Sequence, residues 1–160
     1  MGVQALWHFS FTVSDIDRSV TFYGDLLGME VITRQDQANA YTEKLVGMPG
    51  ASLKVAMLKI PGFPAGPSRH HLELVEYVHP RGVKADVRTN NVGAPHLAMV
   101  VEDIHVEYAR LSAAGVRFRS DPVEIVAGVN KGGWTVYFLD PDDITLEISQ
   151  PPAGRLALYE

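Results

Sequence analysis

Two histidines and two glutamates stand at matching places in a sequence that repeats itself, and they are the residues best suited to chemistry. When residues 93–115 are laid over the N-terminal segment, His96 falls on His8. Glu147, in Leu-Glu-Ile, likewise matches Glu73, in Leu-Glu-Leu. Imidazole nitrogens and carboxylate oxygens are ligands that Zn, Co, Ni and Mn accept. These residue types therefore favour a divalent metal site with positions left open for a substrate.

The pattern around each histidine predicts a β-strand. Every second residue from 5 to 13 and from 97 to 101 is apolar, which is the period of a strand with one packed face. His8 and His96 lie between these apolar residues. Both imidazoles are therefore expected on the less apolar face of their strands.

A helix is predicted after each of these strands. Asp15 and Asp103 are suitable N-caps, and apolar residues follow each of them at helical spacing. Gly28 and Gly115 then supply the residue type that most often ends a helix. Each copy therefore begins with a strand, an amphipathic helix and a glycine stop.

The glutamates lie on later strands, where the residues on both sides of each glutamate are apolar. A carboxylate between two packed side chains must point to the opposite face, where it is exposed, paired or bound to metal. If the two copies pack side by side about a pseudo-twofold axis, His8, Glu73, His96 and Glu147 converge as four metal ligands. His71 lies on the same strand face as Glu73 and is the rival ligand, but Glu73 is favoured because it matches Glu147 within the repeat.

The remaining segments complete two βαβββ modules, 1–80 and 91–150, in one domain that spans residues 1–160. Strands are predicted at 30–33, 52–60, 70–77, 116–118, 134–139 and 144–149, with a hairpin turn at 140–143. The first copy is longer between its histidine and its glutamate, and its polar segment 34–50 is predicted to be a loop or lid. The tail 151–160 has no place in the repeat, and its apolar residues predict a homodimer.

Composition excludes several classes of function. The formal net charge is −5 with scattered charges, which argues against nucleic acid or an anionic membrane surface as a partner. There is no apolar run near the roughly 20 residues of a membrane span, and no signal-peptide core. The chain has no cysteine, which excludes disulfides and thiol catalysis. We therefore expect a cytoplasmic protein that binds neither nucleic acid nor membrane.

At these residues the chain resembles the vicinal oxygen chelate superfamily, which includes glyoxalase I, methylmalonyl-CoA epimerase, extradiol dioxygenases and the fosfomycin and bleomycin resistance proteins. The resemblance covers nearly the whole chain and rests on His8 with the helix 15–28, Glu73, His96 in GAPHLAMVVEDI, and FLDPD at 138–142 before Glu147. It implies an α+β fold in which two tandem βαβββ modules form a half-open eight-stranded barrel around a metal. The metal chelates two adjacent oxygens of a small-molecule substrate. Glu147 matches the carboxylate next to the reacting carbon in glyoxalase-like members, so the resemblance implies that it is the catalytic base.

Departures from individual family members narrow the reaction. Thr12 stands where bacterial glyoxalase I has an arginine for glutathione, and Tyr77 stands where an asparagine would help. Lys54 aligns with a catalytic glutamate of methylmalonyl-CoA epimerase, so the second acid or base would be Lys54 or a lid residue such as Glu43. Extradiol dioxygenases have no ligand at the position of Glu73, which makes iron the less favoured metal.

These comparisons favour a metal-dependent isomerase, an epimerase of a small keto compound or an acyl-CoA. It would act through a metal-stabilised enolate and proton transfer by a side chain. The alternatives are a glyoxalase-type lyase or extradiol-type iron dioxygenase, and a resistance protein that only binds a drug or metabolite.

Overall fold

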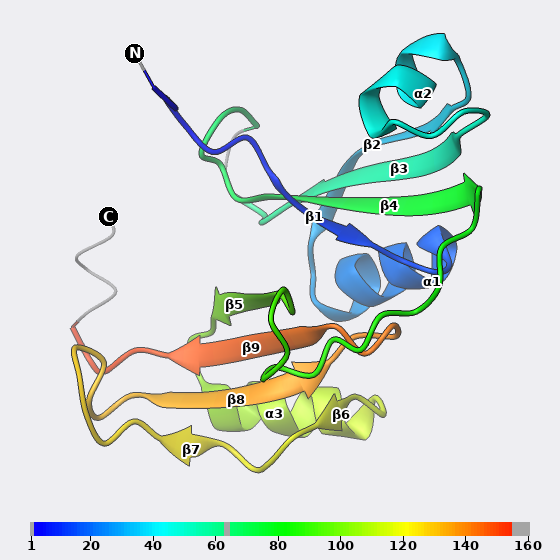
Figure 1. Ribbon diagram of the computed structural model, residues 1–160. Coiled ribbons are helices and arrows are strands. Elements are labelled where there is room, and N and C mark those ends of the chain that lie inside the picture. The colour runs from blue at the N-terminus through cyan, green and yellow to red at the C-terminus, as the bar shows by residue number, and fades with distance from the viewer. Residues whose placement is uncertain (1, 63–64, 155–160) are drawn as a thin grey trace. The chain divides into compact units, whose positions relative to one another are not determined.

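The computed structural model describes residues 2–62 and 65–154, and the chain divides into two compact units, 1–84 and 85–160. Each unit is one β-sheet with helices, and the elements are labelled in Figure 1. The α+β class and the two consecutive βαβββ modules predicted from the sequence are confirmed. Within the described residues, no helix is both long enough and apolar enough to cross a membrane.

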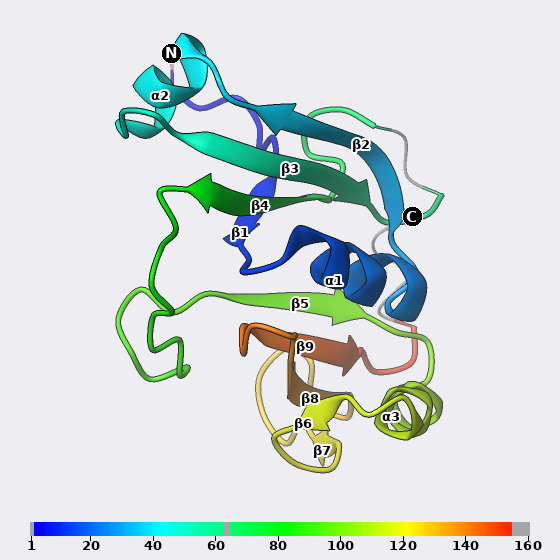
Figure 2. The same cartoon turned by 90° about the vertical axis from the view of Figure 1, so that its right-hand side faces the viewer.

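The first unit is a four-stranded sheet in the order β1-β4-β3-β2. Its elements are β1 (Phe9–Thr12), α1 (Ile16–Val20), η1 (Thr21–Leu26), β2 (Glu30–Gln37), α2 (Ala40–Val46), β3 (Ser52–Lys59) and β4 (His71–His79). The first and last strands of the module pair in parallel, and the other two pairs are antiparallel. Figure 2 shows β4 between β1 and β3.

The second unit repeats this topology. Its elements are β5 (His96–Val100), α3 (Ile104–Ala113), β6 (Arg117–Phe118), β7 (Val123–Glu124), β8 (Trp134–Leu139) and β9 (Thr145–Gln150). β5 pairs in parallel with β9, β9 pairs antiparallel with β8, and both β6 and β7 pair with β8. The two short strands therefore stand where the first unit has the single strand β2. Pro122, which has no N–H to donate, lies in the interruption between them.

The residues predicted to begin and end the helices do so in the structure. The Asp15 side chain accepts a hydrogen bond from the Arg18 N–H, and the Asp103 side chain accepts from the first turn of α3. Gly28 and Gly115 have φ of 76° and 84°, a conformation that favours glycine after a helix. The helix of the first unit continues from α1 into the π-helical turns of η1 before it ends.

In each unit one face of the sheet is buried against the helix that follows the first strand, α1 and η1 or α3. In the first unit Phe11, Leu72 and Leu74 are buried on this face, and the Phe11 ring lies 6.4 Å from the Tyr23 ring of the helix. In the second unit Leu146 and Ile148 are buried in the same way. Residues one position along each strand therefore point to the opposite face, as alternation requires. In the first unit Val46 of α2 packs on this opposite face, against Leu53, Val55 and Val75. The same opposite face carries the candidate site.

Several predicted boundaries were wrong. Segment 34–50 is not a continuous loop, because β2 extends to Gln37 and Ala40–Val46 is helical between an Asn39 N-cap and Gly47. The predicted first strand, residues 5–13, is shorter and covers Phe9–Thr12, so His8 lies immediately before it. β7 was not predicted. The apolar part of the predicted tail, 156–159, lies outside the described residues, and the homodimer stays a prediction.

Candidate functional site

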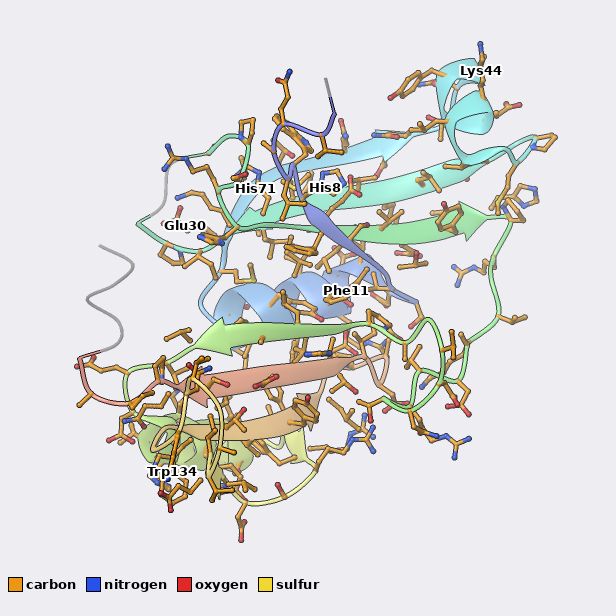
Figure 3. The ribbon with its side chains drawn as sticks, turned by 60° about the vertical axis from the view of Figure 1, so that its left-hand side comes forward. His8, Phe11, Glu30, Lys44, His71 and Trp134 are labelled. Carbon is orange, nitrogen blue, oxygen red and sulfur yellow. The ribbon has the colours of Figure 1, made fainter. Side chains whose placement is uncertain are left out.

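In the first unit the structure brings His8 and Glu73 together. His8 directly precedes β1, and Glu73 lies on β4, the parallel neighbour of β1. His8 Nε2 lies 3.4 Å from Glu73 Oε2, and the two side chains are 30% and 21% exposed. Figure 3 labels His8 near the start of β1. One imidazole and one carboxylate thus meet on the face away from α1 and η1.

In the second unit His96 and Glu147 form the equivalent pair. His96 begins β5 and Glu147 lies on its parallel neighbour β9. His96 Nε2 lies 3.6 Å from Glu147 Oε2, and the ring of Tyr137 on β8 lies 5.7 Å from the imidazole. The carboxylate is well covered, because Glu147 is 17% exposed whereas His96 is 49% exposed.

Strand register makes the two pairs equivalent. Glu73 pairs with Ser10, two residues after His8, and Glu147 pairs with Ala98, two residues after His96. Because side chains two residues apart lie on the same face of a strand, the same offset produces the same His–Glu contact in each unit. The contact is therefore a property of the repeated module.

The distances within each pair fit two ligands of one metal ion. Both exceed the usual hydrogen-bond range of about 2.7–3.2 Å. Two donors that each lie about 2.0–2.2 Å from a common ion are separated by roughly 2.8–3.6 Å at octahedral or tetrahedral angles. Neither unit by itself brings three His, Asp or Glu groups into a metal-binding cluster among its described residues. Each unit therefore offers two candidate ligands, and both metal binding and the joining of the two pairs at one ion stay predictions.

The Glu147 carboxylate has further partners. The Thr135 hydroxyl on β8 donates to Glu147 Oε1 at 2.6 Å, and the Ser149 hydroxyl on β9 donates to the same oxygen at 2.7 Å. Oε1 is thus held by two hydroxyls, while Oε2 faces His96. An outer hydrogen bond of this kind fixes the orientation of a metal ligand.

Two buried nitrogens of the first unit have no hydrogen-bond partner within the described residues. They are His8 Nδ1 and His71 Nε2. His71, the rival ligand, is 6% exposed at the start of β4, and its ring meets the edge of Trp7 at 6.4 Å. Because Nε2 of His71 is covered, Glu73 is the better placed of the two as a ligand.

Lys54 is not placed for proton transfer at this pair. Lys54 pairs with Glu76 in the β3–β4 register, and its Nζ lies 4.0 Å from Glu76 Oε2. Glu76 is three residues from Glu73, so it and Lys54 lie on the opposite face of the sheet. Glu43 belongs to α2, not to a loop, and Val46 of this helix packs on the face of the sheet that carries Glu73. Of the two residues suggested for the second acid or base, Lys54 therefore lies on the face of the sheet opposite to Glu73, and the role of Glu43 stays a prediction.

Three residues of this site were missed in the sequence: Thr135, Tyr137 and Ser149. Strand alternation was the available signal, because Val136 and Phe138 are buried on the helix side and Ile148 separates Glu147 from Ser149. Alternation places all three on the face of Glu147. It does not reveal which hydroxyls contact the carboxylate.

With this geometry established, comparison with known proteins identifies the family. The family model described as "Glyoxalase/Bleomycin resistance protein/Dioxygenase superfamily" matches residues 5–148. The chain belongs to this superfamily. The match includes both His–Glu pairs and Thr135, so the resemblance noted from the sequence is confirmed.

Curated members of the superfamily that resemble the chain are enzymes. The 2-epi-5-epi-valiolone epimerase of an Actinomyces species is 35% identical over 158 residues, which cover 96% of this chain and 82% of the relative. The lactoylglutathione lyase of Haemophilus influenzae is 30% identical over 156 residues, covering 94% and 96%. Enzymes of the superfamily similar to this chain are thus epimerases and lyases.

Solved structures of the superfamily confirm the fold. A glyoxalase family protein from Bacillus cereus has a TM-score of 0.76 at 20% identity, with 96% of this chain and 97% of that chain covered. Glyoxalase I of Leishmania major has a TM-score of 0.61 at 21% identity, with 98% and 92% covered. At these identities the likeness concerns the fold alone.

Proposed function

We propose that the protein is a metal-dependent epimerase of a small cyclic keto compound. The observation that carries this proposal is the repeated His–Glu pair, His8 with Glu73 and His96 with Glu147, at one strand register. The epimerase from Actinomyces supports a keto-cyclitol substrate, because its name specifies a valiolone and it covers nearly all of this chain. A divalent ion held by these residues would act as a Lewis acid toward two adjacent substrate oxygens.

Glu147 is the proposed general base. Its Oε1 is held by Thr135 and Ser149, so Oε2 is the oxygen left to take a proton from the carbon next to the substrate carbonyl. The carboxylate is 17% exposed, which limits competition from water. Hydroxyls both donate and accept hydrogen bonds, so the same two groups can hold Glu147 before and after it receives the proton.

Inversion of a carbon centre needs a proton carrier on each side of it. The duplicated module supplies an equivalent carboxylate, Glu73, which we propose for the second side in place of Lys54. Glu73 is 21% exposed and lies 3.4 Å from His8, much as Glu147 lies from His96. Both carboxylates thus have a role as ligand and as proton carrier.

A lyase of the lactoylglutathione type is the second candidate, supported by the 30% identical relative from Haemophilus influenzae. Thr12 argues against it, because a hydroxyl cannot form the ion pair with a substrate carboxylate that an arginine provides. The two reactions share proton transfer at a carbon next to a carbonyl. They differ in whether glutathione is required.

The test is exchange of substrate hydrogen in deuterated water, followed by NMR with keto-cyclitols, 2-keto acids and acyl-CoA thioesters. We expect deuterium at the carbon next to the carbonyl of a keto-cyclitol, with no consumption of oxygen or glutathione. Glu147→Gln, compared at equal metal occupancy, should slow exchange by about 10²–10⁴-fold. The matched control is Glu124→Gln, which makes the same change at an exposed position of β7.

Other outcomes would assign the protein elsewhere. Tight binding without exchange would overturn the epimerase and favour a binding protein. Turnover that requires glutathione would favour the lyase, and oxygen uptake with ring opening would favour a dioxygenase.

A further inference from the structure

Two hydroxyls on neighbouring strands converge on one oxygen of Glu147. Thr135 and Ser149 are paired in the register of β8 and β9, and Ser149 lies two residues after Glu147 on the same strand face. Their oxygens are 2.8 Å apart, and the Thr135 hydroxyl also lies 3.3 Å from the Ile148 carbonyl. Three polar side chains thus form one connected group on this sheet.

The distances indicate that both hydroxyls donate to a carboxylate. Hydroxyl-to-carboxylate bonds are about 2.5–2.7 Å long, shorter than the neutral mode of about 2.7–2.8 Å. Thr135 and Ser149 lie 2.6 and 2.7 Å from Glu147 Oε1. Each hydroxyl has one proton to donate, so with both directed at Oε1 this oxygen is occupied. The carboxylate then presents a single oxygen, Oε2, toward His96.

The equivalent positions of the first unit cannot do this. Val75 lies two residues after Glu73 on β4, as Ser149 follows Glu147, and Val55 pairs with Val75 as Thr135 pairs with Ser149. Both valines are buried in an apolar cluster with Leu53. Valine has no hydrogen to donate, so these positions leave the Glu73 carboxylate without the restraint that Glu147 has.

We propose that Thr135 and Ser149 are positioning residues that hold Glu147 in its working rotamer, so that the second unit provides the pre-arranged half of the site and the first unit the adaptable half. This inference rests on the proposed function for its catalytic consequence. Its structural content, the fixed rotamer of Glu147, can be measured without any metal or substrate. A held ligand loses less conformational entropy when it binds.

The variants are Thr135→Val with Ser149→Ala, which remove both hydroxyls, and Thr135→Ser with Ser149 intact, which keeps them. Val75→Ala is the matched control, because it shortens the side chain at the position equivalent to Ser149 and removes no hydroxyl. It should lower the stability of the fold, as loss of buried methyl groups does. It should leave metal affinity within about twofold of the wild type. The control thus separates an effect of lower fold stability from an effect of a misoriented Glu147.

Three measurements decide the matter. In metal-free crystals we expect one Glu147 rotamer in the wild type and a displaced or divided carboxylate in the double variant. In chelator competition with Zn²⁺ the double variant should bind about 10–100-fold more weakly, as is usual when an outer hydrogen-bond partner of a ligand is lost. At saturating metal, kcat should fall more than KM rises. Thr135→Ser, which keeps both hydroxyls, should have the wild-type rotamer, zinc affinity and kinetic constants.

An unchanged Glu147 rotamer in a folded double variant would overturn the inference, whether or not the protein binds metal. Wild-type zinc affinity and kcat in that variant would also overturn it. A wild-type protein that binds neither zinc nor substrate would instead overturn the proposed function, while the rotamer comparison still decides the role of the hydroxyls.

Discussion

The two units of this chain share a backbone plan and differ in what surrounds the carboxylate. In both, a histidine at the start of the first strand meets a glutamate on the parallel last strand, at Nε2–Oε2 distances of 3.4 and 3.6 Å. In the second unit two hydroxyls hold the glutamate, and in the first unit valines occupy both positions. Register thus preserves the pair, while the neighbouring residue types have diverged.

A second pair of equivalent positions also shares a contact but differs in residue type. Three residues after each glutamate, a side chain accepts a hydrogen bond from the first backbone N–H of the module's helix. Glu76 Oε2 accepts from Ile16 at 3.0 Å, and Gln150 Oε1 accepts from Ile104 at 2.9 Å. The contact is kept, but the first unit uses a charge and the second an amide. The two units therefore share the geometry of this contact and differ in the chemical group that makes it.

The largest expected effect concerns the metal ligands. Removing a ligand from the held pair, by His96→Ala or Glu147→Gln, should weaken Zn²⁺ binding by at least about 100-fold, the upper limit for loss of an outer partner. His8→Ala should also weaken it, and Glu73→Gln should weaken it least, because no hydroxyl holds this side chain and its amide oxygen can adjust to coordinate, whereas the amide at position 147 would be held in place. Elemental analysis with chelator competition measures these affinities. Equal losses of Zn²⁺ affinity in variants of the two units would contradict the proposed difference between them. Full metal occupancy in all four variants would contradict the metal site itself.

Part of the candidate site could be predicted from the sequence. The His–Glu pairs were predictable because alternation and the repeat act together: each histidine lies on the less apolar face, and each glutamate lies between packed side chains. The hydroxyl group around Glu147 was not predictable, since alternation places Thr135 and Ser149 on the right face but does not fix the rotamers that bring them within 2.7 Å.

The wrong prediction for segment 34–50 has a different cause. β2 is an edge strand whose side chains are mostly exposed, so it lacks the apolar alternation that marks a half-buried strand. The helix α2 is short, and its buried side chain, Thr42, is polar. Both elements are stabilised by pairing and packing with distant residues, and local pattern does not record such contacts.

An intermediate effect is expected at the helix starts. Glu76 is buried and charged, so Glu76→Ala leaves the Ile16 N–H without its acceptor and should lower the free energy of unfolding by about 1.5–3 kcal/mol. Gln150→Ala removes a neutral, less buried acceptor and should cost about 0.5–1.5 kcal/mol. Urea unfolding measures both. The tryptophans lie one in each unit, Trp7 and Trp134, so Trp→Phe backgrounds report each unit separately.

The control for this pair is Glu76→Gln, which keeps an acceptor oxygen and should recover part of the loss. If Gln150→Ala proved as costly as Glu76→Ala, the charge at Glu76 would have no special role.

The smallest effects should appear at opposite ends of the pH range, where the two units tie their helices to the outer part of the sheet by different means. In the first unit Arg34 on β2 forms an ion pair with Asp17 of α1, and its hydrogen bond holds the pKa of Asp17 below the ordinary 3.8. In the second unit the Tyr108 hydroxyl of α3 donates to Asp121, between β6 and β7, at 2.7 Å, and this hydrogen bond raises the pKa of Tyr108 above 10.0.

The signs of these shifts fix where each tie is lost. A lowered carboxyl pKa stabilises the fold above the unfolded value of 3.8, and the contribution disappears as the pH falls through the folded pKa. A raised phenol pKa stabilises the fold below 10.0, and that contribution disappears as the pH rises through the folded pKa.

The stability difference between wild type and Asp17→Asn should therefore vanish in acid, and that between wild type and Tyr108→Phe should vanish in alkali. Both ties are exposed to solvent, so both differences should be small and the first should shrink further in high salt. Urea unfolding of the three proteins at a series of pH values measures this, and a Tyr108→Phe difference that persists undiminished in alkali would contradict the role given to the hydrogen bond with Asp121.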